Sequence, residues 1–507
     1  MHQVLVRNGS PGFGYGILIG LLLLGAAPEA VFAQCPDPPP VTITAPQPPA
    51  DVCIPDGFLK NPIRFFDDFS WRSFISMVWP AQQGMRGVPD MQQKISSVSG
   101  PRVFETFKAD WEVFQPSADG TSPPPAPSPW NSYAGQSPCS HINIGFGDVV
   151  LASFSKFANL GEAGFGSLVG LLPVQNGTYT RYSTYFNKTE FDQILGQRLY
   201  LRSNLHTEVT FDQILGQHLY LRSSFHNGVT FQDGAIDLKA AWIDMTNVKH
   251  PERYYTRTAW VLNPFTTPNP TCTQIVVGLV GLHIVQKTPS RPQWIWSTFE
   301  HVDNIPGNVP LDVDKLPSGP FAYNNNDGSH MPDNNPDPWD PLKVSATPTI
   351  FNVERLTPIN QLTVDTNNKY QQKLRDDKVG GPWEFYQLVM TQWPLQLKRP
   401  QPIPPSQSGT PNNTFPGTGA DSAFTNVTLE TFDQTDITTG CMNCHEDTRQ
   451  ATDFLWSLEL NAWPSKIAPP SAPMFALRPL AQPALSPGNV SPELERLREL
   501  MESAVKR

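Results

Sequence analysis

Two cysteines and one histidine stand close together near the end of the chain. The run Cys-Met-Asn-Cys-His extends from Cys441 to His445. Cysteines three positions apart lie on one side of a helical turn, so each thiol can form a thioether with a vinyl group of one haem. The histidine after the second cysteine, Cys444, then lies under the ring and supplies an axial nitrogen to the iron. The run therefore predicts one covalent haem c with His445 as the proximal ligand.

A bare Cys-x-x-Cys also occurs in redox-active disulfides and in zinc sites. The first would be expected in a thioredoxin-like βαβ setting, which the surrounding sequence lacks. The second would need another Cys-x-x-Cys or a closely spaced histidine pair, and neither follows. The sequence also lacks the second Cys-x-x-Cys-His that a two-haem peroxidase needs, and it has no P-loop and no G-x-G-x-x-G. Haem attachment is the interpretation that remains.

The residue on the far side of the iron decides what a haem can do. A methionine or second histidine closes the iron and favours electron transfer, whereas an open position permits ligand binding or oxidative chemistry. Met474 follows the motif in a proline-rich stretch that could fold back over the haem, and it is our first choice as distal ligand. Met442 lies within the attachment loop on the proximal side and is a poor candidate. Four others remain open: Met390, Met501, His283 and His301.

Both candidate histidines fall in expected strands. A histidine in a strand is more often a hydrogen-bonded core or surface residue than a ligand, so this is our preferred interpretation of His283 and His301. Glu300, His301 and Asp303 could also be a metal or acid–base cluster. Neighbouring strand residues point to opposite faces, however, which separates Glu300 from His301.

The first 33 residues have the pattern of a secretory signal peptide. Arg7 gives a weakly positive start, an apolar run of twelve residues extends from Gly16 to Ala27, and small residues precede a cleavage site near Ala33. The run is shorter than the roughly 17–25 residues of a membrane span. A lipid anchor on Cys35 is disfavoured because Gln34 is a poor residue at that position. We therefore expect an exported protein without a stable membrane span, in a bacterial periplasm, where haem is attached to c-type cytochromes.

The charge of the chain limits its partners. The formal net charge is −10 at pH 7, and removal of residues 1–33 leaves it unchanged because Arg7 and Glu29 cancel. A negative chain is repelled by nucleic acid and by anionic lipid, so we expect neither as a partner. An acidic surface would suit a basic redox partner protein, although it is also the ordinary surface of a soluble protein.

Four cysteines remain once two are assigned to haem. An even number in an oxidising compartment predicts two disulfides. Three connectivities are possible, and the sequence does not separate them. The four are Cys35, Cys53, Cys139 and Cys272.

Composition and periodicity divide the chain into five parts. We expect the signal peptide at 1–33, a proline-rich lead-in at 34–62, an α+β module at 63–399, a linker at 400–413 and a c-type haem segment at 414–507. The haem segment is short and rich in proline, so we expect it to be helical or irregular and to pack on the module rather than to fold alone. Its last helix would begin at Ser491, followed by Pro492.

The module is expected to contain an antiparallel sheet with flanking helices. Apolar residues at helical spacing predict helices over Phe66–Trp79 and Val103–Phe114, whose aromatic stripes suit a core better than a haem pocket. Residues 115–138 and 303–350 have loop composition. Pro382–Trp393 could be strand or helix. Strands without intervening helices imply antiparallel pairing, and we expect them at Gly177–Phe186, Ile236–Ile243, Arg253–Leu262, Gln274–Lys287 and Gln293–His301.

A 20-residue unit occurs twice between 190 and 229. Phe-Asp-Gln-Ile-Leu-Gly-Gln begins at Phe191 and again at Phe211. Each copy is expected to form a short amphipathic helix, capped at Thr189 and Thr210. Two copies are too few for a solenoid, so the unit is interpreted as a local tandem duplication.

Three stretches together resemble a known family. They are Phe69–Ala81, the pair Gly281–Thr288 with Gln293–Asn304, and Cys441–His445. The chain resembles large exported bacterial proteins described as cytochrome c family, which carry one haem motif near the C-terminus. The resemblance covers most of residues 60–460 and implies haem and export, but it implies no particular reaction. The doubled unit departs from the family pattern.

Three functions follow from these features. A periplasmic monohaem c-type cytochrome that transfers single electrons is the leading hypothesis. A haem-dependent redox enzyme, of peroxidase or oxygenase type, is the alternative favoured by the size of the module. A haem-based binding or sensor module is the third.

Overall fold

The computed structural model describes part of the chain, and several expectations lie outside that part. Among them are the signal peptide, the second copy of the repeated unit, the linker and the last helix, together with the single residues Cys444, Met474 and Met501. The described residues are 35–55, 62–97, 99–133, 137–139, 142–151, 171–205, 229–263, 271–307, 321–326, 334, 347–393, 426–435, 441, 445 and 452–464.

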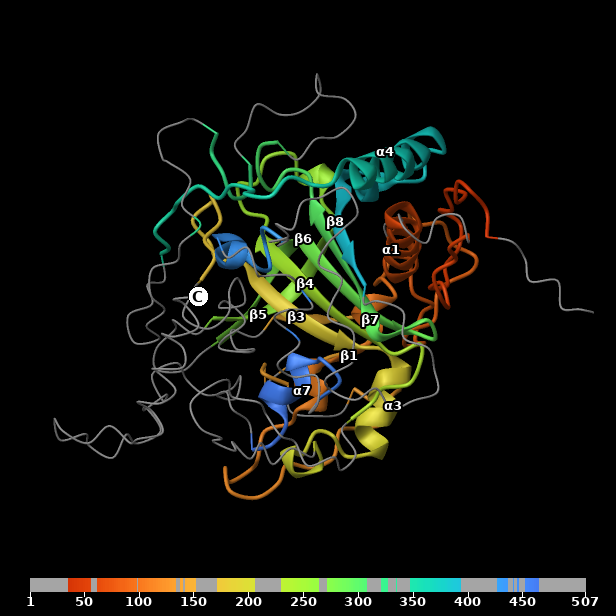
Figure 1. Ribbon diagram of the computed structural model, residues 1–507. Helices are drawn as coiled ribbons and strands as arrows, with labels where there is room; N and C mark the ends of the chain where they lie inside the picture. Colours follow the sequence, from red (N-terminus) through yellow and green to blue (C-terminus); the bar gives the residue numbers. More distant parts are fainter. Residues whose placement is uncertain are drawn as a thin grey trace, which may run out of the picture.

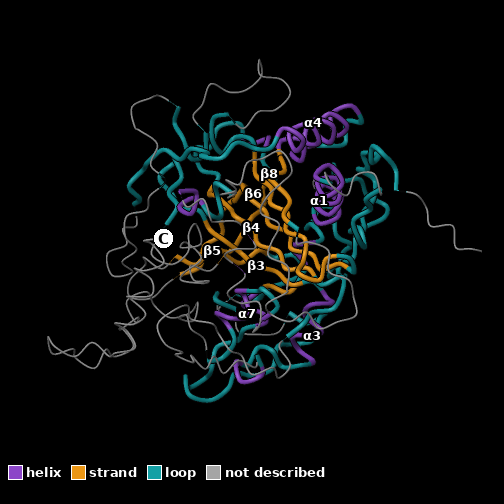
Figure 2. The backbone as a smooth tube through the Cα atoms, in the orientation of Figure 1, coloured by secondary structure: helices purple, strands orange, loops and turns teal. Residues whose placement is uncertain are grey.

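A mixed, curled sheet lies at the centre of the described fold (Figures 1 and 2). Strands β4 to β7 confirm the four strands expected between 236 and 302. The long strand β6 pairs with β4, β5 and β7, so the order is not that of a simple meander. All neighbours are antiparallel except β2 and β5. The eight described strands are β1 (Lys108–Ala109), β2 (Val149–Leu151), β3 (Arg181–Phe186), β4 (Ile236–Asp244), β5 (Thr256–Asn263), β6 (Thr271–Thr288), β7 (Arg291–His301) and β8 (Tyr386–Gln392).

Two helices lie together beside β7 and β8 (Figure 1). Helix α1 (Ile63–Met77) confirms the expected first helix, and it ends shortly before Pro80, which cannot continue it. Helix α4 (Gln361–Asp376) was not predicted from the sequence; the Asn360 side chain caps it by accepting a hydrogen bond from Leu362 N. Trp71 of α1 stacks on Tyr370 of α4 with ring centroids 4.9 Å apart, which joins the helices through their buried faces.

The helix expected over Val103–Phe114 is wrong. This stretch contains a 3₁₀ turn at Phe104–Thr106, strand β1 and the single-turn helix α2 (Asp110–Val113). Strand β1 pairs with Phe186 and Tyr185 of β3, and this extended pairing interrupts the helical pattern. The aromatic residues of the stretch are nevertheless buried or half-buried in the core, as expected.

Three other elements refine the sequence predictions. Helix α3 (Lys188–Gly196) confirms a helix in the first copy of the repeated unit, but its cap is Asn187 rather than Thr189. Strand β3 starts at Arg181, after the start expected at Gly177. Pro382–Trp393 is a 3₁₀ turn at Gly381–Phe385 followed by β8, which resolves the open choice mainly in favour of a strand.

Two disulfides lie within the described residues. Cys35 bonds to Cys53 and Cys139 bonds to Cys272, which is one of the three possible connectivities. The expectation of two disulfides is confirmed, and both are compatible with an exported protein. Among the described residues, no helix is long and apolar enough to cross a membrane.

Helix α7 (Trp456–Asn461) follows the described part of the motif. In Figure 1 it lies below the sheet, away from α1 and α4. Ser457 Oγ in α7 donates to Asp237 Oδ2 at the start of β4 (2.8 Å). Arg202 donates to the carbonyl of Pro464, just beyond α7 (2.9 Å). The Arg202 guanidinium also lies 3.2 Å from the carboxylate of Glu459 within α7. Residues 456–464 are therefore bound to two segments of the module, at Arg202 and at Asp237.

Candidate functional site

Strand β7 contacts the chain on both sides of the Cys441–His445 run. Trp296 and Thr298 lie on one face, because strand residues alternate, whereas Trp294 departs from regular strand geometry with a φ of 71°. Trp294 binds Asp453, Trp296 lies against His445, and Thr298 binds Asn426. The odd-numbered Ser297 instead faces α1, where it bonds to Ser70 (2.7 Å). Strand β7 thus contacts residues before, within and after the motif.

His445 is held through its ring. Nδ1 lies 2.6 Å from Phe454 O. A carbonyl oxygen only accepts, so Nδ1 carries the hydrogen and the Nε2 lone pair is directed away from this bond. The ring also lies against the Trp296 indole, with centroids 4.4 Å apart and planes tilted by 55°. This tautomer is the one in which an imidazole binds a metal through Nε2.

The carbonyl that accepts from His445 belongs to a sharply bent backbone. Asp453 and Phe454 have φ values of 54° and 76°, in the left-handed region that side chains other than glycine rarely adopt. Two such residues in succession are held only where the surroundings over-determine them. Trp294 Nε1 donates to Asp453 O (2.9 Å), which fixes the bend from the β7 side.

A buried ion pair fixes the same bend through the Asp453 side chain. Lys287 Nζ donates to Asp453 Oδ2, and the backbone N of Phe231 donates to the same oxygen (2.8 Å). The Lys287 side chain is 1% exposed and lies 5.3 Å from the centroid of the Trp294 ring. Burial of both charges makes the pair costly to break from one side, since either partner alone would be an uncompensated buried charge.

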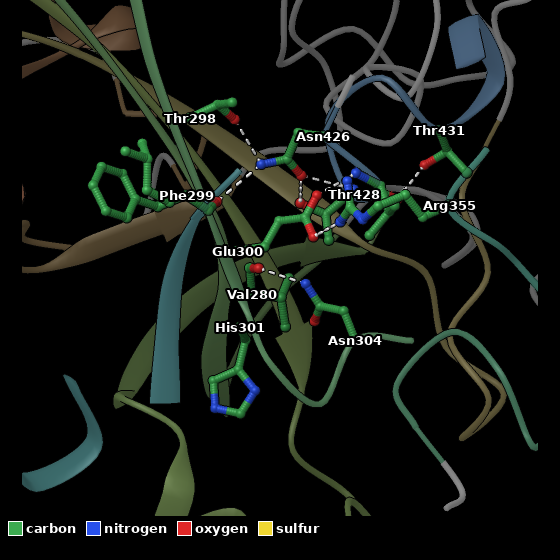
Figure 3. Close-up of polar contacts among 12 residues, drawn as sticks. Val280, Thr298, Phe299, Glu300, His301, Asn304, Arg355, Asn426, Thr428 and Thr431 are labelled. Carbon is green, nitrogen blue, oxygen red and sulfur yellow. Dashed lines mark hydrogen bonds and ion pairs between the residues drawn. The ribbon is translucent and has the colours of Figure 1, made fainter. Parts of the chain in front are cut away.

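The stretch before the motif is fixed on the other half of β7 (Figure 3). Asn426 Nδ2 donates to Thr298 Oγ1 (2.8 Å) and to Phe299 O (2.9 Å). Val427 N donates to Glu300 Oε1 (2.6 Å). The other carboxylate oxygen of Glu300 accepts from Arg355. Burial raises the pKa of Glu300, against the opposing effect of the Arg355 charge.

A glycine in β6 allows this stretch to approach the sheet. A Cβ on Gly281 would collide with Thr428 Oγ1. Nearby, His283 Nε2 lies 3.3 Å from Glu430 Oε1. Although burial opposes it, the contact with His283 holds the pKa of Glu430 below its usual value. His283 is therefore placed as an anchor for residues 426–435.

His301 uses both ring nitrogens in backbone hydrogen bonds. Nδ1 accepts from Asp303 N (3.1 Å), so Nε2 carries the hydrogen and donates to Arg253 O (3.1 Å). The ring stacks on Tyr254 at 3.8 Å. Complete burial lowers the pKa of His301 to about 3, which keeps the ring neutral. Figure 3 shows that Glu300 and His301 point to opposite sides of β7. His301 is therefore a hydrogen-bonded core residue.

The described candidates for the iron are only partly brought together. Cys441 is half-buried and, like His445, has helical backbone. The two residues are four positions apart in the sequence, the spacing at which residues of a helix share a face. Cys441 packs against an apolar cluster that contains Met390, the one open methionine candidate within the described residues. Neither strand histidine is placed as a ligand by its contacts.

The residues present fit a haem c. A half-buried thiol and an imidazole in the Nδ1–H tautomer are four positions apart in the sequence; the imidazole lies against an indole ring, and the thiol packs against an apolar cluster. Among the described residues, no group of three or more histidines, cysteines or carboxylates could hold a bare metal ion.

Comparison with known proteins gives no assignment. No family model, no curated protein and no solved structure matches the chain.

The sequence did not point to the residues that hold His445. Lys287, Asp453 and Phe454 were not singled out, because a buried ion pair between distant residues and a left-handed bend leave no local pattern. Trp294 and Trp296 were visible only as part of the Gln293–Asn304 stretch. Nothing in the sequence shows what these two indole rings contact.

Proposed function

We propose that the protein is an exported monohaem c-type cytochrome, with the haem attached through Cys441 and Cys444 and the iron bound on one side by His445. The single observation that carries the proposal is the hydrogen bond from His445 Nδ1 to Phe454 O, because it orients Nε2 for axial ligation within a Cys-x-x-Cys-His run. When bound, haem supplies an iron that accepts and releases one electron.

The chain itself would position and shield this group. The Phe454 carbonyl would orient the His445 imidazole and increase its basicity. Trp296 and the apolar cluster next to Cys441 would exclude water from one side of the site, which affects the reduction potential of a haem. Residues 414–507 would pack on the module, held by the β7 contacts. A basic partner protein would receive or supply the electron, attracted by the net charge of −10.

The proposal that residues 414–507 depend on the module can be tested by expressing them alone. We expect residues 414–507 expressed alone with an export signal to lack stable covalent haem, because Lys287, Trp294 and Trp296 belong to the module. A stable fragment that carries haem would show instead that the segment is an independent cytochrome domain.

A haem-dependent redox enzyme is the second candidate. The observation that favours it is the size of the structured module, since a sheet of eight described strands with its helices exceeds what one electron carrier needs. The two candidates differ at the distal side of the iron. Met474 remains the proposed distal ligand, and Met390 is the described alternative, being buried in the cluster against which Cys441 packs.

Optical spectra of the purified protein separate these functions. A carrier with methionine on the iron should show the methionine–iron charge-transfer band when oxidised, and its reduced spectrum should not change on addition of carbon monoxide. Ready binding of carbon monoxide by the reduced protein would contradict the carrier and support the enzyme or sensor. Met474→Ala and Met390→Ala should be measured side by side. The variant that loses the charge-transfer band identifies the methionine on the iron.

A further inference from the structure

Two of the residues that hold the bend at Phe454, Lys287 and Trp294, lie on the module, far from the motif in sequence. Lys287, near the end of β6, donates to the Asp453 carboxylate, and Trp294, near the start of β7, donates to the Asp453 carbonyl. The bend would otherwise relax, because left-handed φ values at Asp453 and Phe454 are unfavourable for residues with a Cβ.

We propose that the buried Lys287–Asp453 ion pair, together with the Trp294 indole, positions the proximal ligand and tunes the haem. This inference rests on the proposed function. The three residues act through the Phe454 carbonyl, so they are positioning residues and do not touch the iron. Their effect is to hold a short Nδ1–H···O=C bond, 2.6 Å between its heavy atoms.

A strong hydrogen bond from Nδ1 has a defined electronic consequence. It shifts electron density onto the imidazole and makes it a better donor to the iron, which stabilises the oxidised state. Loosening the bend lengthens the bond and weakens this donation. The reduction potential should therefore rise when the ion pair or the Trp294 donor is removed.

Charge and position can be separated by the choice of variants. Removing Lys287 alone takes away a positive charge, which by itself lowers the potential, and removing Asp453 alone does the reverse. The double variant Lys287→Met/Asp453→Asn leaves the net charge unchanged. Any rise in its potential reports the loss of positioning rather than the loss of a charge.

A buried ion pair at the opposite end of β7 provides the matched control. Arg253 and Asp303 lie 3.1 Å apart with side chains 11% and 6% exposed, next to His301. The double variant Arg253→Met/Asp303→Asn also removes a buried pair without changing the net charge. It should lower the stability of the protein but leave the reduction potential at the wild-type value.

The test is a spectroelectrochemical titration of the full exported chain at pH 7, with resonance Raman measurement of the iron–histidine stretch in any form whose sixth position is open. We expect a higher potential in Lys287→Met/Asp453→Asn and, to a smaller extent, in Trp294→Phe, which keeps the ring but loses the donor to Asp453 O. The stretch should move to lower frequency.

The outcomes separate the inference from the function on which it rests. Wild-type potentials in both test variants, or the same shift in the Arg253/Asp303 control, would overturn the positioning role while haem is still attached. Absence of covalent haem from the wild-type protein would overturn the proposed function itself. If the double variant fails to load haem, Trp294→Phe alone decides, because it removes one hydrogen bond and no charge.

Discussion

A carbonyl oxygen has no hydrogen to give, so the contact between His445 Nδ1 and Phe454 O determines where the imidazole proton lies. This hydrogen bond fixes the tautomer of the residue that we propose as the proximal ligand. Trp294 and Trp296 of β7 and the bend at Asp453 then determine how firmly the ring is held.

Replacement of His445 tests this assignment. His445→Ala should abolish stable attachment of haem, because the iron loses its proximal ligand while the chain matures. His250→Ala removes an exposed histidine at a turn and should leave the haem content unchanged. Haem staining of denaturing gels, with haem absorbance per chain, measures both. A His445→Ala protein with full covalent haem would show that another residue is the proximal ligand.

Asp67 provides a second test at the residue scale, away from the motif. Asp67 lies in α1, and its carboxylate accepts from Thr363 of α4 (2.7 Å) and Thr391 of β8 (2.9 Å). Burial raises the pKa of Asp67 to about 7, against the hydrogen bonds from the two threonines. The unfolded chain releases this proton near pH 4, so the folded state loses stability as the pH rises from about 4 to about 7.

Asp67→Asn should remove this loss. Integrated over that interval, the wild-type protein loses roughly 4 kcal/mol of unfolding free energy through this one group. We therefore expect the variant to gain stability relative to the wild type between pH 5 and pH 8. Denaturant unfolding at several pH values measures the difference. Parallel pH profiles for the two proteins would show that Asp67 is not the group that holds the proton.

At the scale of elements, β6 and β7 form the hairpin on which the flanks of the motif lie. At Gly281 of β6, an added Cβ would meet the side chains of Asn426 and Thr428. The Thr428 hydroxyl in its path is short and is itself bonded to Asn426 Oδ1 (2.7 Å), so it cannot move aside easily.

Gly281→Ala should therefore destabilise the protein, by about 1–3 kcal/mol as is usual for overpacking. Gly278→Ala in the same strand is the matched control, because its Cβ would meet the flexible Met245 side chain, which can rotate away. Thermal or denaturant unfolding compares them. The idea is wrong if the two alanine variants are equally stable, or if Thr428→Ala fails to relieve the cost of Gly281→Ala.

Particular elements show what the sequence could predict. Helix α1 and strands β4 to β7 were predicted because apolar and β-branched residues repeat at the period of each element. The helix over Val103–Phe114 was wrong because pairing of β1 with β3 overrides a local pattern. Helix α4 was missed because its exposed face is strongly polar. At the site, Cys441 and His445 were predicted from spacing, whereas the Lys287–Asp453 pair depends on contacts between residues 166 positions apart.

At the scale of the whole molecule, the two disulfides close loops of very different length. Cys139 and Cys272 are 133 positions apart, whereas Cys35 and Cys53 are 18 apart. A cross-link stabilises mainly by restricting the unfolded chain, and the longer loop restricts it more.

Removal of the long-range disulfide should accordingly be the more damaging change. Cys139→Ser/Cys272→Ser should lower the unfolding free energy by roughly 5 kcal/mol, against about 3 kcal/mol for Cys35→Ser/Cys53→Ser. Denaturant unfolding of the exported variants gives both values. A larger loss from the short loop would mean that native contacts of the lead-in outweigh the loop entropy.

We propose that the chain carries one haem, bound covalently through Cys441 and Cys444. The most direct measurement is the intact mass of the denatured full-length protein after export in a host that matures c-type cytochromes, together with its pyridine haemochrome spectrum. We predict a mass increase of one haem and a spectrum of two thioether bonds, both lost in Cys441→Ser/Cys444→Ser. A wild-type protein with the mass of the bare polypeptide would contradict the claim.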